Sequence, residues 1–572
     1  MNPALTKAAI RKAVQNTIRN SPRVLIHTAT GRLHDKFKQA TLFESLPVFK
    51  ELISSMTTHI DDAHIQREVA KYYRYATFSH TWEDNEPLFE DVIHIVVYAL
   101  EESFTHDKLQ MFCKIAREAG FHWAWSDTCC INKSDHFVLQ EALVAMFKWY
   151  EGSDLTIIFL RGVRSPSQRG DLMRSIWNTR AWTLQEYHAS KVVQFYTEDW
   201  SPYMNLDIPN HKDSPEIISE MEEATNANVS AQALRALRPG LEGIREKLCL
   251  ASRRETTLVE DAAYSLLGIF SVSLPIVYGE GDQALGRLLA QLLTSSGDTS
   301  ILAWTGKSGS FNSCLPSGIT VFNNLPNSYI PLAIAGAEME TITSKMRPSS
   351  PNLALVMRLY DRLHELPVPS FANQRMKLPC LTFKLGPVIA NRGASGHVFR
   401  ARTGALGIVE IRTTEDLSRL DSLTLVHPWI DFLLDRRQPI TEAIPENTND
   451  QTFSARDSPS SSSPASIAGA VKPTRKARMI SQLGRPFSLW AGDVDSLLSP
   501  SPLPLTEKRA RALRFIARLK QPFGALLFTP TRQNVEEYRR VASESLITVQ
   551  VEELPSMVLN KLIEGARTLD VL

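Results

Sequence analysis

HWAWSDTCCINKSDHFVLQEALVAMFKWYEGSDLTIIFL, residues 122–160, is the stretch that decides the fold of this chain. It predicts a short apolar strand, a polar turn, an amphipathic helix and a second strand. Side chains of one helical face recur at steps of four, three and four residues, at Leu139, Leu143, Met146 and Tyr150. The run LTIIFL at 155–160 is typical of a buried strand. We interpret the stretch as a βαβ unit, with the turn at 126–134 on the sheet edge where ligands gather in open α/β folds.

Length and composition set the class of protein. With 572 residues the chain is too long for one compact core, so two to four domains are expected. A hydrophobic content of 43% is ample for globular cores, and a net charge of +1 gives no reason to expect a nucleic-acid binder. The start of the chain lacks the apolar core of a signal peptide, and no apolar run approaches the ~20 residues of a membrane span. We therefore expect a soluble, cytoplasmic protein.

The order of patterns along the chain predicts five segments. Residues 1–65 look helical and polar. Residues 66–310 alternate strands with helices, which favours an α/β domain with a mostly parallel sheet flanked by helices. Residues 311–442 carry short apolar runs punctuated by Pro and Gly, which is typical of a β-rich domain. A Ser/Pro-rich, disordered linker is expected at 443–475 and a small C-terminal α/β or helical module at 476–572.

The sequence lacks the common motifs of nucleotide-binding proteins, zinc proteases and serine hydrolases. There is no GxxxxGK[ST] loop, no GxGxxG fingerprint, no HExxH pair and no GxSxG elbow. Six cysteines without a CxxC pair argue against a disulfide framework and a zinc ribbon. The adjacent Cys129 and Cys130 are interpreted as buried thiols that pack as small hydrophobes, and no metal site is expected. These residues alone indicate a multidomain α/β protein and no particular reaction.

Three separated segments resemble the three motifs of the fungal heterokaryon-incompatibility (HET) domain. They are YATFSHTW at 75–82, WSDTCCIN at 125–132 and RAWTLQE at 180–186, in the order and spacing of that family. Two later runs, at 254–281 and 296–304, resemble a subset of the same family. The resemblance therefore covers about residues 75–304 and places a HET domain within 66–310.

Two departures from the family pattern alter charge rather than fold. Lys133 stands where the family has glutamine after C-I-N, and Glu83 stands where glycine often follows the first tryptophan. The resemblance implies a protein of fungal non-self recognition, that is heterokaryon or vegetative incompatibility, and of regulated cell death. It implies other incompatibility or signalling proteins as partners, with a homo-oligomer as an alternative.

A candidate binding site lies in the turns that follow the predicted strands. In a parallel sheet these turns share one edge, so we expect a polar cleft flanked by aromatic rings. A carboxylate beside an indole face could hold a planar or cationic ring such as nicotinamide. The candidate cofactor-binding residues are Ser79, His80, Trp82, Asp127, Asn132 and Trp182.

The HET domain has been compared with the TIR fold, which either assembles signalling complexes or cleaves NAD. That comparison makes NAD a candidate substrate, although no cofactor is required by the sequence. Glu141 is the first catalytic candidate, since its place on the helix before LTIIFL resembles that of the TIR-type glutamate. Glu186 is the second, because Trp182 on its own face could supply a ring platform. The alternatives are a solvated charge at Glu141, structural bracing at Glu186, and a non-catalytic signalling scaffold.

The basic stretch 508–520, KRARALRFIARLK, has an apolar stripe and a basic side. We interpret it as a surface helix packed on the C-terminal module. The alternative is contact with anionic lipid or a partner helix.

Overall fold

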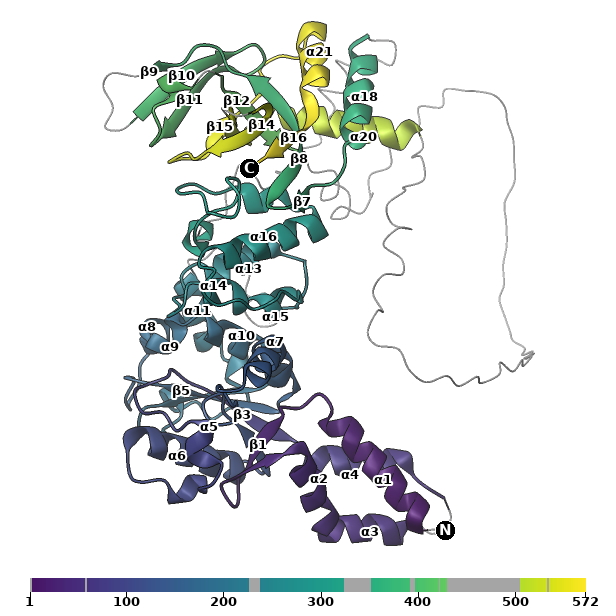
Figure 1. Ribbon diagram of the computed structural model, residues 1–572, viewed down its shortest axis with the longest axis vertical. Helices are drawn as coiled ribbons and strands as arrows, with labels where there is room; N and C mark the ends of the chain where they lie inside the picture. The colour runs from purple at the N-terminus through teal and green to yellow at the C-terminus, as the bar shows by residue number, and fades with distance from the viewer. Residues whose placement is uncertain are drawn as a thin grey trace, which may run out of the picture.

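The computed structural model describes residues 3–56, 59–225, 237–323, 351–390, 397–420, 422–429, 505–531 and 534–572. The predicted linker at 443–475 lies outside these residues. Figure 1 shows an α/β sheet in the lower part, a layer of helices that includes α13 and α16 above it, and a β-rich part at the top. The N-terminal helices α1 to α4 stand beside the lower sheet.

The lower sheet has the strand order β2-β1-β4-β3-β5-β6. Its central strand β3 runs parallel to β4 and to β5, and β5 runs parallel to β6. The predicted α/β architecture with a mostly parallel sheet is therefore confirmed. The strands are β1 (Val24–His27), β2 (Arg32–Asp35), β3 (Tyr75–Ser79), β4 (Trp123–Trp125), β5 (Leu155–Leu160) and β6 (Val193–Thr197).

Helices cover both faces of this sheet, which is why β3 and β5 are buried along their whole length. Phe78 of β3 stacks on Phe112 of α6 (Phe104–Glu118) with ring centroids 4.4 Å apart. On the other face lie α7 (His136–Gly152) and α10 (Trp182–Ala189). Asp135 begins α7 as its N-cap, since its carboxylate accepts a 2.9 Å hydrogen bond from the backbone of Phe137.

The N-terminal segment corrects one expectation. Residues 1–65 were expected to be helical, but Val24–Asp35 form a hairpin that extends the sheet antiparallel to β4. Its strand VLIH is short and apolar, and Gly31 adopts a φ of +68° in the turn, which favours glycine. The remainder of the segment is helical as expected, in α1 (Pro3–Ile18), α2 (Lys36–Ser45), α3 (Pro47–Ser55) and α4 (Asp62–Tyr72).

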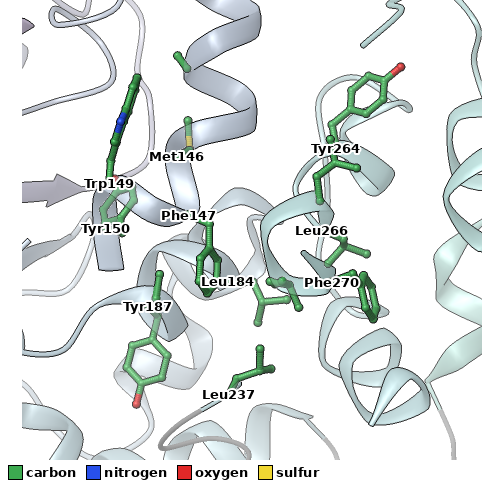
Figure 2. Close-up of a cluster of buried hydrophobic side chains, with 14 of the residues drawn as sticks. Met146, Phe147, Trp149, Tyr150, Leu184, Tyr187, Leu237, Tyr264, Leu266 and Phe270 are labelled. Atoms are coloured by element: carbon green, nitrogen blue, oxygen red, sulfur yellow. The ribbon is translucent and has the colours of Figure 1, made fainter. Parts of the chain in front are cut away.

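A middle layer of helices packs against α7 and α10. Gly268 in α15 approaches α7 so closely that a Cβ atom there would lie 2.2 Å from the Cβ of Phe147. Figure 2 shows Phe147 pointing from α7 into a buried cluster that also contains Leu184 of α10, Leu266 and Phe270. The helices of this layer are α13 (Ile244–Ala251), α14 (Asp261–Tyr264), α15 (Leu267–Phe270) and α16 (Gln283–Ser296).

The C-terminal half is β-rich, but its parts do not follow the predicted division at the linker. Strands β8 and β12 come from the 311–442 range, and β13, β14 and β16 come from 476–572, yet all belong to one seven-stranded sheet. β16 lies between β14 and β8, so the last strand of the chain joins the two ranges. The strands are β7 (Ser370–Ala372), β8 (Arg375–Lys384), β12 (Thr424–Pro428), β13 (Phe523–Thr531), β14 (Asn534–Val541), β15 (Ile547–Val549) and β16 (Ala566–Val571).

In the described residues of this half, a second, three-stranded sheet and the helices α18, α20 and α21 accompany the seven-stranded sheet. The sheet contains β9 (Ile389–Ala390), β10 (His397–Thr403) and β11 (Gly407–Thr413), and the helices are α18 (Pro351–His364), α20 (Leu505–Leu519) and α21 (Ser556–Gly565). The basic stretch forms most of α20. Leu513, Phe515 and Ile516 of this helix are buried in the hydrophobic core of the C-terminal half. Lys508 pairs with Asp361 of α18 at 2.5 Å. The expected packing of this helix is thus present.

The remaining short elements are α5 (Phe89–Val92), α8 (Asp171–Arg174), α9 (Ile176–Thr179), α11 (Pro215–Thr225) and the 3-10 helices η1 (Val97–Ala99), η2 (Tyr203–Asn205), η3 (His211–Asp213), η4 (Thr299–Leu302), η5 (Ile319–Phe322) and η7 (Leu417–Arg419). In the part of the chain that the structure describes, none of the helices combines the length and the apolar character of a membrane span.

Candidate functional site

The carboxyl edge of the parallel strands contains a topological switch point. The chain leaves β3 for β4 on one side and then crosses over to β5 on the other side of β3. In open α/β sheets a crevice forms where the connections diverge in this way. Ser79, the last residue of β3, lies at this point.

Ser79 lies at the centre of a buried polar group, here called the inner group. Hydrogen bonds link Ser79, Tyr150, Trp177 and Glu186, and the charge of Arg254 acts on Glu186. The Ser79 hydroxyl donates to Glu186 Oε2 at 2.5 Å and accepts a 2.8 Å hydrogen bond from Trp177 Nε1. The Tyr150 hydroxyl donates to the Phe78 carbonyl at 2.7 Å and also interacts with Glu186. The helical spacing in the sequence placed Tyr150 on the apolar face of its helix, without a polar role.

The Glu186 carboxyl has an altered acidity. Burial raises its pKa first, and the nearby charge of Asp127 raises it further. Hydrogen bonds from Ser79 and Tyr150 and the charge of Arg254 act in the opposite direction, and the resulting pKa is about 8. Glu186 is therefore mostly neutral at pH 7.

Arg254 closes the inner group on the side of α10. Its guanidinium donates to the Arg180 carbonyl at 2.9 Å, to Thr183 Oγ1 at 2.8 Å and to Asn178 Oδ1 at 3.1 Å. Burial lowers the pKa of Arg254 to about 10, and Glu186 raises it in part. In the sequence, Arg254 was marked only by its place in the run 254–281, which resembles a subset of the HET family. That resemblance assigned the arginine no role.

A second, outer group lies at the surface of the same edge. The Trp82 side chain, 52% exposed, donates from Nε1 to Asp127 Oδ2 at 2.8 Å. The Lys133 ammonium lies 3.5 Å from the centroid of the Trp82 ring. Burial raises the pKa of Asp127 and lowers that of Lys133, and each charge partly offsets the shift of the other.

His80 lies beneath the surface of this edge. It stacks on Phe78 with centroids 4.3 Å apart, and neither ring nitrogen has a hydrogen-bond partner in the described residues. Burial, and then the charges of Lys108 and Lys133, hold the pKa of His80 well below its usual value. Lys108 itself is buried and pairs with Glu86. His80 is therefore a neutral core ring in this conformation.

Three predicted site residues lie apart from these groups. The half-exposed Glu141 forms an ion pair with Arg23 Nε at 3.4 Å. Asn132 accepts a 3.0 Å hydrogen bond from the Ser134 backbone within its own turn. Trp182 donates a hydrogen bond to Asp261 of α14. The structure brings together the other predicted residues, Ser79, His80, Trp82, Asp127 and Glu186.

The inner group is closed to solvent in this conformation. Ser79 and Trp177 are 0% exposed and Glu186 is 5% exposed, so a substrate has no contact with the carboxyl group. A surface hollow lined by Leu206, Pro209 and Glu216 among others lies near η3, beyond β6. Among the described residues no cluster of histidine, cysteine and acidic side chains could hold a metal ion.

The family match covers the outer group and, of the inner group, Ser79 and Tyr150. Residues 75–171 match the family model described as heterokaryon incompatibility protein (HET). The chain is 31% identical over 225 residues to the vegetative incompatibility protein HET-E-1 of Podospora anserina, in an alignment that covers 37% of this chain and 16% of that protein. A search of solved structures gives no significant match. Residues 75–171 of this chain are therefore similar to the heterokaryon-incompatibility (HET) domain, and the chain spans about a sixth of the length of the curated relative that it matches.

Proposed function

We propose that this protein acts in fungal non-self recognition, as a component of heterokaryon or vegetative incompatibility, and that its activation leads to regulated cell death. The match of residues 75–171 to the HET family carries this proposal. The similarity to a vegetative incompatibility protein over 225 residues supports it. The partners would be other incompatibility or signalling proteins, or further copies of this chain.

We further propose that the HET domain acts by binding partners rather than by cleaving NAD. Cleavage of the ribosyl–nicotinamide bond builds positive charge, which an ionised carboxylate in contact with the substrate would stabilise. Glu186 is 5% exposed, and its pKa of about 8 keeps it mostly neutral at pH 7. Glu141 is held by Arg23 on the outer face of α7. Neither carboxyl group is arranged for that role in this conformation.

Inducible expression of the full chain in a heterologous fungal cell tests both statements. A high protein concentration favours self-association or partner binding by mass action. Strong expression should therefore activate the protein in part without its natural trigger. We expect arrested growth and loss of viability while cellular NAD stays at the level of uninduced cells. The Glu186→Gln variant keeps the shape of the side chain and should retain this activity at equal protein level.

Two outcomes would contradict the proposals. Normal growth at high expression, in the presence and absence of coexpressed incompatibility partners, would count against the cell-death function. A fall in NAD that precedes growth arrest in the wild type and disappears in Glu186→Gln would show that the domain is an NAD-cleaving enzyme.

A further inference from the structure

The exposed Trp82 side chain is a fixed aromatic platform at the carboxyl edge of the sheet. Its ring is 52% exposed, yet the hydrogen bond from Nε1 to Asp127 at 2.8 Å sets its orientation. Asp127 lies two residues after the end of β4, so the sheet positions the indole through this carboxylate. An oriented, solvent-accessible indole is the best of the protein rings for holding a cation.

The charges around this ring favour a positively charged occupant. Burial lowers the pKa of Lys133, whereas the charges of Asp127, Glu86 and Glu90 raise it and so act in the direction that stabilises a cation. Glu90 is itself fixed by a 2.8 Å hydrogen bond from the Ser134 hydroxyl. An aromatic face bordered by carboxylates is the arrangement that recognises quaternary ammonium groups in proteins.

The structure shows a cation already at this position, the ammonium of Lys133, 3.5 Å from the ring centroid. Its bonding there is loose, because the one hydrogen bond shown for this ammonium in the described residues goes to the Thr128 carbonyl at 3.3 Å. An ammonium group carries three donors on a flexible four-carbon stem, so it can leave the ring for water at small cost. A ligand that is less strongly hydrated than an ammonium would compete with it.

We propose that Trp82, Asp127 and Glu90 form a binding site for a weakly hydrated organic cation, such as a quaternary ammonium or pyridinium group, and that Lys133 occupies this site as a built-in competitor. The site involves no reaction, so it depends neither on the incompatibility function nor on NAD cleavage. Lys133 sets the affinity of this site for an organic cation. While its ammonium group lies on the Trp82 ring, most of the site is occupied, and without that group the ring and the carboxylates are free to bind a ligand.

Calorimetric titration of the full chain with the N-methylnicotinamide cation tests this proposal. The Lys133→Gln variant should bind the cation about tenfold more tightly than the wild type, since it removes the competing charge and leaves both carboxylates. Neutral nicotinamide has the same ring without the charge and should show no such gain. Lys148→Gln, which removes an exposed lysine of α7, is the matched control and should bind as the wild type does.

A double variant and a second substitution keep the test decisive. Trp82→Ala combined with Lys133→Gln should lose the gain, because Trp82 is exposed and its removal leaves the core intact. Lys133→Ser serves if the glutamine variant does not fold, as judged by its thermal melt. Equal cation affinity in the wild type and in both Lys133 variants, or retained affinity without Trp82, would overturn the proposal. Either result would leave the growth assay for the incompatibility function unaffected.

Discussion

Glu186 is a carboxyl group that the fold removes from water and places beside Ser79, Tyr150 and Arg254. A free glutamate has a pKa near about 4.3, whereas burial raises that of Glu186 to about 8. Between these two values the folded protein keeps a proton that the unfolded chain has lost. The free energy of unfolding therefore falls as the pH rises through this window, by at most about 1.4 kcal/mol per pH unit from this group.

Glu186→Gln should remove this part of the pH dependence. At about pH 5 the variant should be no more stable than the wild type, because both carry an uncharged side chain. As the pH rises to about 8.5 the wild type should lose stability relative to the variant. Urea unfolding at several pH values measures the difference. Glu141→Gln, which removes a half-exposed surface charge, is the control. Parallel stability curves for wild type and Glu186→Gln would contradict the proposed burial of a neutral carboxyl group.

Gly268 is a residue at which the absence of a side chain is required by packing. A Cβ there would lie 2.2 Å from the Cβ of Phe147, far inside contact distance, so α15 would have to move away from α7. Gly268→Ala should lower the free energy of unfolding by about 1–3 kcal/mol or more. The control is Gly318→Ala, where the nearest atom lies 4.0 Å from the added Cβ and φ is extended. Chemical denaturation of the two variants compares them, and equal stabilities would be evidence against this close approach.

At the scale of elements, β3 is a strand with a polar face buried against α7 and α10. Thr77 Oγ1 lies 2.7 Å from Thr156 Oγ1 and donates to Ser153 Oγ at 3.2 Å. Both neighbours have further partners, since Thr156 contacts Ser190 and Ser153 donates to the Tyr150 carbonyl. These hydroxyls tie β3 to β5 and to the ends of both helices.

Thr77→Val replaces this hydroxyl with a methyl group of similar size. Because Thr156 and Ser153 keep other partners, we expect a loss of about 1 kcal/mol in the free energy of unfolding rather than the larger cost of orphaned polar groups. Thr41→Val on the exposed side of α2 is the control, with an expected change within about 0.5 kcal/mol. A loss equal to that of the control would mean that the buried hydroxyl face does not stabilise β3.

The sequence could predict elements whose pattern is local. The helical spacing of the 136–152 region and the β-branched run at 155–160 identify α7 and β5 because each element carries its own periodicity. The hairpin of β1 and β2 was missed because its strands are four residues long and gain their stability from β4, about a hundred residues away. The same holds for β16, which pairs over six residues with β8, a strand of a different predicted segment.

The candidate site was predictable only in part. The turns after β3 and β4 share one edge in any parallel sheet, so Ser79, Trp82 and Asp127 could be grouped from the strand order. The surroundings of Glu186 could not be predicted, because Trp177 reaches Ser79, and Arg254 acts on Glu186, through tertiary packing that leaves no periodic signal. Trp182 and Glu186 share a helix, but their side chains have different partners, which spacing alone does not reveal.

At the scale of the whole molecule, residues 299–316 join the HET-containing half to the C-terminal sheet. Arg245 of α13 donates to the Ala303 carbonyl at 2.8 Å from one side. From the other side Arg540 of β14 donates to the carbonyls of Leu302 at 2.8 Å and Trp304 at 2.7 Å, with its guanidinium 3.8 Å from the Trp304 ring centroid. The segment is thus held between two buried arginines, one from each half.

Residues 299–316, here called the joint, also contact the end of the last strand, β16, through Asn312 and Ser313. Asn312 Nδ2 donates to the Val571 carbonyl at 3.0 Å, and the Ser313 backbone donates to the Leu572 carbonyl at 3.0 Å. Since β16 also lies between β14 and β8, the joint is anchored at the centre of the seven-stranded sheet. A substitution that removes a contact of the joint should therefore loosen the connection between the two halves before it unfolds either of them.

Arg540→Met tests this expectation, because methionine fills much of the volume but donates no hydrogen bond. The Leu302 and Trp304 carbonyls would lose buried partners, at a cost of about 1–3 kcal/mol each. We expect faster amide hydrogen exchange across 299–316 and β14, while the amides of β3 and β5 keep their protection. Arg375→Met, which removes an exposed ion pair with Glu537 on the same sheet, is the matched control and should change neither region. The buried hydrophobic cluster around Leu569 and Val571 is continuous with that of the HET-containing half, so the two halves could instead open as one cooperative unit. Equal acceleration of amide exchange in β3, β5 and residues 299–316 would show this and would contradict the expectation.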